Sequence, residues 1–169
     1  MIPDSLQTIA EISIGLAGFS GLIVALRKKT GPFTGVQKFR LQVLLVLTFG
    51  SMFLSLLPDL LTNLGVAENV IWTSCAAAML AFSLTFVIWM IRAGVRVARV
   101  VPEIFNWWIF YSLVSGHALV ILVQTAVIAG FADNRSPGTF MLGLIWYLLH
   151  AAYQFSRMLF VLPRSPKHV

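Results

Sequence analysis

Residues 70–91 read VIWTSCAAAMLAFSLTFVIWMI, a stretch that contains no charged side chain and ends directly before Arg92. A helix that crosses a membrane needs about 20 consecutive, mostly apolar residues to span roughly 30 Å of hydrocarbon. This stretch is both long enough and apolar enough. It therefore predicts a transmembrane helix, and with it a membrane protein.

Four other stretches of the chain have the same character. Turn signals separate them, among them Asn63-Leu64-Gly65 and the segment from Asp133 to Gly138. The predicted spans are residues 6–26, 40–62, 70–91, 104–130 and 139–162. With 169 residues, the chain is long enough for one domain and too short for two ordinary ones. We therefore expect an all-α polytopic membrane protein, a single domain over residues 1–169 that bundles five transmembrane helices.

The composition supports the same class. Hydrophobic residues make up 59% of the chain and charged residues 11%, whereas soluble domains have roughly 45–50% and about 25%. A surface this apolar needs lipid to cover it, so the bilayer is the first expected partner. The net charge of +6 does not indicate nucleic acid, because the basic residues flank apolar stretches instead of forming one stripe. We expect a multi-pass protein of the plasma membrane, in bacteria the inner membrane.

Basic residues mark one side of the predicted membrane. They follow the first, third and last spans, whereas the opposite side has Arg135 together with Asp4, Glu68 and Asp133. In membrane proteins the cytoplasmic loops carry the excess of Lys and Arg. The N-terminus is therefore expected outside and the C-terminus in the cytoplasm. The cations expected to contact lipid headgroups are Arg27, Lys28, Lys29, Arg92, Arg96 and Arg99.

Small side chains follow one face of the first predicted span. The residues that we expect to pack against another helix are Ser13, Ala17, Gly18, Gly21 and Ala25. Small residues at this spacing let two backbones approach closely in a membrane. The alternative is that this face lines a narrow pore, which requires the protein to oligomerise around the first helix.

Two carboxylates lie near the outer ends of the first two spans. Glu11 is about 8 Å and Asp59 about 5 Å in from the outer end, at a rise of 1.5 Å per residue. Ser51 and Ser55 share the stripe of Asp59 on the second span. Carboxylates at one depth can bind a cation or share a proton, which predicts an outer site. Alternatively, Asp59 only reaches the headgroups.

Two histidines lie near the middle of the fourth and fifth spans. His117 shares a face with Gln124, and His150 belongs to a polar stripe with Tyr147 and Gln154. Histidine titrates near neutral pH, so it can relay protons or bind a metal. The alternative is a hydrogen bond between helices that fixes their packing.

Polar groups at successive depths predict a permeation pathway for a small ion or a proton. Five helices rarely enclose a pore alone, so we expect a homo-oligomer. The alternative function is that of an accessory or structural subunit, whose polar stripes contact another membrane protein.

Two further functions receive less support. A subunit that binds haem b could use His117 and His150 as axial ligands. However, helices joined by a short loop pack roughly 8–10 Å apart, which is too close to admit a haem between them. An enzyme is not expected, because Ser115 points about 160° away from His117 on its helix. We therefore expect no cofactor and no metal site.

Overall fold

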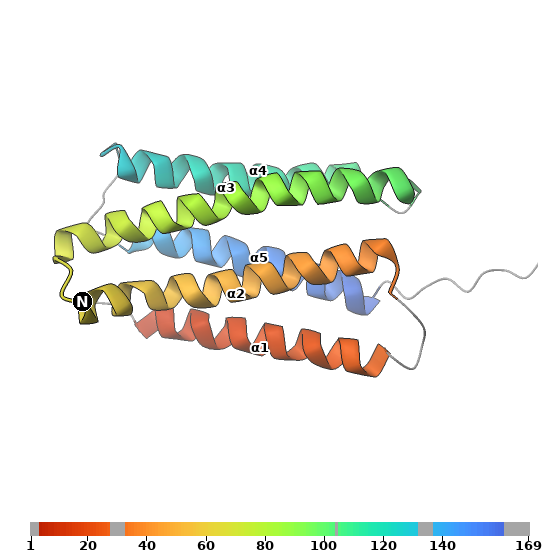
Figure 1. Cartoon of the computed structure of the whole chain (residues 1–169), viewed down its shortest axis with the longest axis horizontal. Coiled ribbons are helices and arrows are strands. Elements are labelled where there is room, and N and C mark those ends of the chain that lie inside the picture. The colour runs from red at the N-terminus through yellow and green to blue at the C-terminus, as the bar shows by residue number, and fades with distance from the viewer. Residues whose placement is uncertain (1–3, 28–32, 104, 132–136, 161–169) are drawn as a thin grey trace, which may run out of the picture.

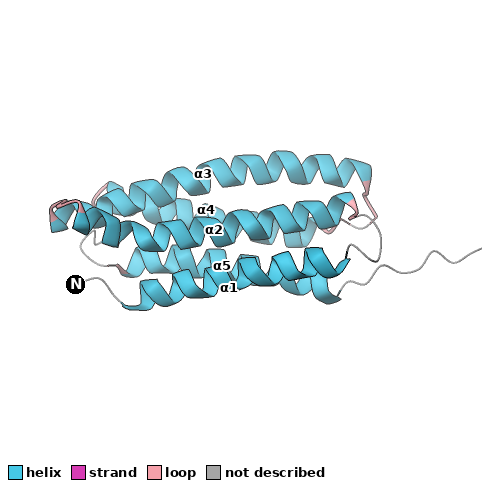
Figure 2. Cartoon of the chain, turned by 60° about the horizontal axis from the view of Figure 1, so that its bottom comes forward, coloured by secondary structure: helices cyan, strands magenta, loops and turns pink. Residues whose placement is uncertain are grey.

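The computed structural model describes residues 4–27, 33–103, 105–131 and 137–160. These residues form a bundle of helices in which successive helices run in opposite directions (Figures 1 and 2). The five helices are α1 (Asp4–Arg27), α2 (Gly35–Asn63), α3 (Glu68–Val100), α4 (Trp107–Ile128) and α5 (Gly138–Phe160). The described ranges contain no strand, so the prediction of an all-α fold is confirmed.

Four of the helices, α1 to α4, are long and apolar enough to cross a membrane. The chain is therefore a multi-pass membrane protein. The helix α5 is not among these four, and the side chains of Tyr147, His150 and Gln154 along it are all buried. It is also the helix that contacts each of the other four. Its polar residues thus face the inside of the bundle.

The second and third helices extend beyond the spans that the sequence predicts. The helix α2 begins at Gly35 because Thr34 and Gln37 form a capping box, in which each side chain accepts a hydrogen bond from the other residue's backbone N–H. The helix α3 continues to Val100 and has 33 residues, about 50 Å in length at 1.5 Å per residue. Arg92, Arg96 and Arg99 therefore lie on the last turns of α3, and their expected position in a loop is wrong.

Glycines end the second and fourth helices. Gly65 has φ 75° and Gly130 has φ 78°, a left-handed conformation that glycine adopts without a steric penalty. At both ends the following N–H groups bond back to the last carbonyls of the helix, for example Val66 N–H to the Leu61 carbonyl at 3.1 Å. The predicted break at Asn63-Leu64-Gly65 is thus confirmed.

Aromatic rings pack directly on glycines along three contacts between neighbouring helices. One contact joins α2 to α3, one joins α3 to α4, and one joins α4 to α5. The pairs are Gly50 with Phe82, Gly94 with Phe110, and Gly116 with Trp146. A Cβ atom added at these glycines would lie 2.2, 2.5 and 1.9 Å from the nearest ring atom. The absence of a side chain at each glycine therefore sets how closely the helices approach.

The small-residue face of α1 does not make such contacts within the chain. Ser13 is buried and Ala17 half-buried, whereas Gly18, Gly21 and Ala25 are exposed. No atom of the described residues outside the helix backbone lies within 4 Å of a Cβ built at Gly18 or Gly21. Instead, α1 turns larger apolar residues such as Leu6 and Ile9 inward, because they bury more surface. The close packing expected at Gly18, Gly21 and Ala25 does not occur inside one chain.

Candidate functional site

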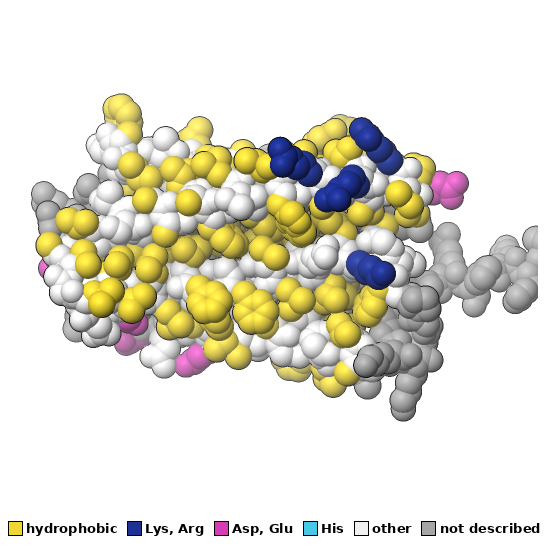
Figure 3. Space-filling view, in the orientation of Figure 1, with side chains coloured by type: hydrophobic (Ala, Val, Ile, Leu, Met, Phe, Trp, Pro, Cys, Tyr) yellow, Lys and Arg dark blue, Asp and Glu magenta, His cyan; other side chains and the backbone are white. Residues whose placement is uncertain are grey.

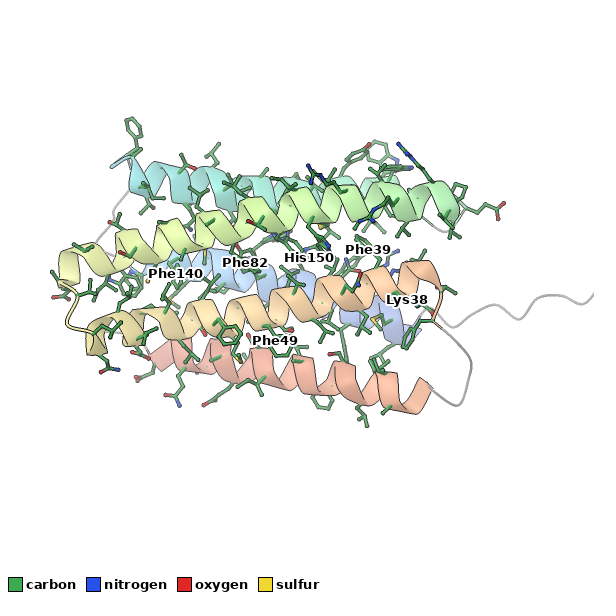
Figure 4. All side chains as sticks on the ribbon, in the orientation of Figure 1. Lys38, Phe39, Phe49, Phe82, Phe140 and His150 are labelled. Atoms are coloured by element: carbon green, nitrogen blue, oxygen red, sulfur yellow. The ribbon has the colours of Figure 1, made fainter. Side chains whose placement is uncertain are left out.

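The two histidines that the sequence places at similar depth are in direct contact. Nε2 of His117 lies 2.9 Å from Nδ1 of His150, which makes a hydrogen bond between α4 and α5. The other ring nitrogen of His150, Nε2, lies 3.0 Å from the amide nitrogen of Gln154 one turn further along α5. All three side chains are buried. Figure 4 shows His150 near the middle of the length of the bundle. We call His117, His150 and Gln154 the polar row.

Aromatic side chains enclose the histidine pair. The ring of Phe86 on α3 lies 4.8 Å from that of His117 and 6.3 Å from that of His150. Tyr147 stacks on His117 at 5.5 Å, and Trp146 lies 6.0 Å from it on another side. Trp146 reaches this position because Gly116, directly before His117, has no side chain in its way. The hydrogen bond of the pair is thus made in apolar surroundings, which strengthens it.

The hydrogen bonds of the polar row link the proton positions of the two histidines to the orientation of the Gln154 amide. If the Gln154 amide N–H donates to Nε2 of His150, the proton of His150 lies on Nδ1 and is donated to Nε2 of His117. The proton of His117 then lies on Nδ1, which has no hydrogen-bond partner among the described residues. If the amide turns so that its oxygen faces His150, every hydrogen bond in the row reverses. The row therefore has two directions, which differ in the orientation of the Gln154 amide and in the proton positions of the two histidines.

Tyr147 lies beside the row and bonds to a residue that the sequence did not single out. Its hydroxyl forms a hydrogen bond with the hydroxyl of Ser83 on α3, and both side chains are fully buried. Ser83 was missed because a single serine in an apolar helix has no pattern of its own. Phe86, one turn further along α3, was missed because a single phenylalanine in an apolar helix has no pattern of its own either.

Gln124 is buried but belongs to another part of the bundle. Its amide donates a hydrogen bond to the backbone carbonyl of Thr139, 3.0 Å away, near the start of α5. Between this bond and Tyr147 lie apolar side chains, since Met79 and Val120 pack at Gly143. Gln124 is therefore separated from the polar row by an apolar layer.

The predicted serines of α2 are buried inside the bundle. Ser51 and Ser55 are 0% and 1% exposed. The Ser55 hydroxyl donates to the carbonyl of Met52 at 2.9 Å, whereas the Ser51 hydroxyl has no hydrogen-bond partner in the described part of the chain. Two polar side chains of this stripe thus face the interior of the bundle.

The predicted outer carboxylates do not enter the interior. Glu11 and Asp59 are both exposed. Glu11 accepts a hydrogen bond of 3.1 Å from the amide of Gln7 on its own helix. Within one chain the structure therefore does not bring these two carboxylates to the polar row, and an outer site shared between them stays a prediction.

Basic side chains gather toward one end of the bundle (Figure 3). This is the end at which α2 begins and α3 ends. Arg92, Arg96 and Arg99 are exposed there, and Nε of Arg96 donates to the Arg92 carbonyl at 3.3 Å. Lys28 and Lys29 lie outside the described residues, and Arg27 is the last residue of α1. Their contact with lipid headgroups stays a prediction.

Haem does not fit between the two histidines of one chain. Axial ligands must lie on opposite faces of the macrocycle. Here the two ring nitrogens are already in hydrogen-bond contact, and Phe86, Tyr147 and Trp146 fill the space around the rings. The described residues also place no group of three or more His, Cys, Asp or Glu side chains together.

No known protein family, curated protein or solved structure matches the chain.

Proposed function

We propose that the chain crosses the plasma membrane five times, with its N-terminus outside, and conducts protons along the polar row. The observation that carries this proposal is the hydrogen-bonded row of His117, His150 and Gln154, buried in the middle of a membrane-spanning bundle. Ionisable residues at such positions are costly and are found mainly on ion and proton pathways. Histidine is the side chain best suited to pass a proton near neutral pH.

The five spans and their orientation rest on the geometry of the bundle. With 23 residues, α5 is about 35 Å long, enough to cross the hydrocarbon beside its neighbours. Tyr147, His150 and Gln154 face inward, so lipid does not oppose its insertion through these side chains. The basic end of the bundle carries Lys38, Arg92, Arg96 and Arg99, which favours a cytoplasmic position for that end. In bacteria the inner membrane also maintains the proton gradient that such a pathway would use.

A proton fits the row better than a hydrated ion does. The side chains of the row touch one another, and the cavity beside Gln154 has a volume of only about 30 Å³. An ion would need a lumen or a ring of ligands that replaces its water shell. A proton needs only hydrogen bonds whose direction can reverse, which the two histidines and the amide supply. Toward the outer side, we propose that the row continues through Tyr147, Ser83 and the buried serines of α2.

Proton flux into liposomes tests this function. The full chain is reconstituted into vesicles that contain a pH-sensitive dye, and a potassium diffusion potential drives the protons. Gln154→Leu interrupts the row and is expected to lower the flux about tenfold or more, the usual effect of removing a group that takes part in proton transfer. Gln42→Leu makes the same chemical change at an exposed position of α2 and is expected to leave the flux unchanged. A wild-type flux no greater than that of empty vesicles would contradict the proposal.

Assembly into a homo-oligomer is part of the proposal, and its support is the exposed face of α1. Gly18 and Gly21 have no packing partner among the described residues, and small residues of this kind favour close helix contacts in lipid. The same face favours the second candidate function, an accessory subunit of a membrane complex. Native mass measurement in mild detergent distinguishes them. We expect two or more copies of the chain, whereas a strict monomer favours the accessory subunit.

A further inference from the structure

The inner end of the polar row opens on a small, positively charged cavity. The cavity has a volume of about 30 Å³ and lies between the start of α2, the start of α4 and the end of α5. Its polar lining consists of Arg40, Arg157, Gln154 and Asn106. The first two are cations, and none of the four side chains is acidic. The cavity therefore attracts negative charge.

Arg40 is the least expected of these residues. The sequence predicts it as the first residue of the second span, whereas the capping box at Thr34 starts α2 earlier and puts Arg40 in its second turn, where its side chain is only 5% exposed. No hydrogen bond or ion pair joins Arg40 to any of the described residues. The charged group with the largest electrostatic effect on it is a second cation, Arg157. A buried charge without a counter-charge is strongly unfavourable. The described residues therefore provide no counter-charge for Arg40.

Two neighbouring groups reinforce the attraction for an anion. The helix α4 begins at the cavity, with Asn106 as its N-cap, and helix N-termini carry partial positive charge. Arg157 is half-buried at the edge of the cavity, where its guanidinium also contacts the Tyr153 ring at 5.6 Å. The oxygen of the Gln154 amide has no partner in the described part of the chain. When this amide turns, it presents N–H groups to the cavity and its oxygen to His150.

We propose that this cavity binds one anion of the size of chloride, held between Arg40 and Arg157. The size follows from the volume, since roughly 10–15 Å³ holds one water and the cavity has about 30 Å³. The anion supplies the counter-charge of Arg40 and accepts from the Gln154 amide. This site binds an anion, whereas the proposed pathway carries protons. The occupancy of the site can therefore be measured without any measurement of proton flux.

Halide binding to the purified, delipidated full chain tests the site. The melting temperature is measured in mixtures of sodium chloride and sodium gluconate at constant ionic strength, together with the line width of the ³⁵Cl NMR signal. For the wild type we expect a saturable rise of the melting temperature and excess line broadening with chloride, because a ligand of the folded state stabilises it. Bromide is expected to replace chloride, whereas gluconate is too large.

Arg40→Gln is expected to reduce both chloride effects to less than about a tenth of the wild-type values. In gluconate alone its melting temperature is expected to equal or exceed that of the wild type, because the unpaired buried charge is gone. The matched control is Arg99→Gln, which removes the same charge from an exposed position of α3 and should leave both effects intact. If Arg40→Gln does not fold, Arg157→Gln serves as the second variant and is expected to weaken chloride binding at least about tenfold.

Three results would overturn the assignment. Chloride effects in Arg40→Gln and Arg157→Gln that equal those of the wild type would place the anion elsewhere. Equal responses to chloride and gluconate would show that only ionic strength matters. A response to added phosphatidylglycerol but not to chloride would identify a lipid phosphate as the ligand instead of a free halide.

Discussion

Replacement of His150 by leucine is expected to destabilise the protein by about 3 kcal/mol and to stop proton flux. The change removes two hydrogen bonds and leaves Nε2 of His117 and the amide of Gln154 buried without partners. Each buried polar group left unsatisfied costs roughly 1–3 kcal/mol, more than the net gain from an ordinary hydrogen bond. Reversible unfolding in mixed micelles measures the loss. Leu149→Ala, at the exposed neighbouring position, is expected to change stability by less than about 0.5 kcal/mol.

A double-mutant cycle separates the histidine pair from a general loss of packing. When His117→Leu is added to His150→Leu, both partners of the hydrogen bond are apolar and no histidine nitrogen remains unsatisfied. We expect the double variant to be more stable than the sum of the two single losses predicts, by about 1–3 kcal/mol. Strict additivity would mean that the two rings do not interact, and the polar row would lose its central bond.

Gly116→Ala is expected to destabilise the protein by about 1–3 kcal/mol, the usual cost of forcing an extra group into a packed interior. The added Cβ would lie 1.9 Å from Cζ2 of Trp146, so the indole ring must move. Trp146 packs against both histidines, with ring centroids 6.0 and 6.5 Å away, so its displacement also reaches the polar row. We therefore expect a loss of proton flux as well as of stability, measured on the same reconstituted samples.

Gly15→Ala, at an exposed position of α1 outside its small-residue face, is the matched control for this prediction. It adds the same methyl group to a helix, but no described atom outside the helix backbone lies within 4 Å of the new Cβ. Alanine also favours the helix over glycine by up to about 1 kcal/mol, so a small gain in stability is expected. If Gly116→Ala were as well tolerated as Gly15→Ala, the contact of Trp146 with Gly116 would not determine the distance between α4 and α5.

The positions of the helices could be predicted from sequence because the requirement to cross lipid is local. Their ends are harder to predict, since outside the hydrocarbon a helix and a loop can have the same polar composition. The turns of α3 that carry Arg92, Arg96 and Arg99 illustrate this difficulty. The start of α2 had a readable signal, because Thr34 and Gln37 have the spacing of a capping box. That signal would also have placed Arg40 on the inner face with Val36 and Val43.

The contacts between helices were predicted less well than the level of each residue along the bundle. A rise of 1.5 Å per residue was enough to place His117 and His150 at one level, because the two helices run in opposite directions and are joined by a short loop. The partner helix of a small face, however, depends on how all five helices pack together. The glycines of α1 have the spacing that favours close packing, yet the glycines that receive aromatic rings are Gly50, Gly94 and Gly116. To predict each of these pairs of a glycine and an aromatic ring, the positions of two helices must be known at once.

The central position of α5 has a consequence for biosynthesis. It follows the other four helices in the chain, it contacts all of them, and it is the least suited to enter lipid without neighbours. Because α1 to α4 are synthesised before α5, we expect them to provide the sheltered surface against which His150 and Gln154 insert. A nascent chain that lacks α5 has no His150 or Gln154 to bond with His117, so the polar row is not formed. If the polar row conducts protons as proposed, an unfinished molecule would therefore not leak protons.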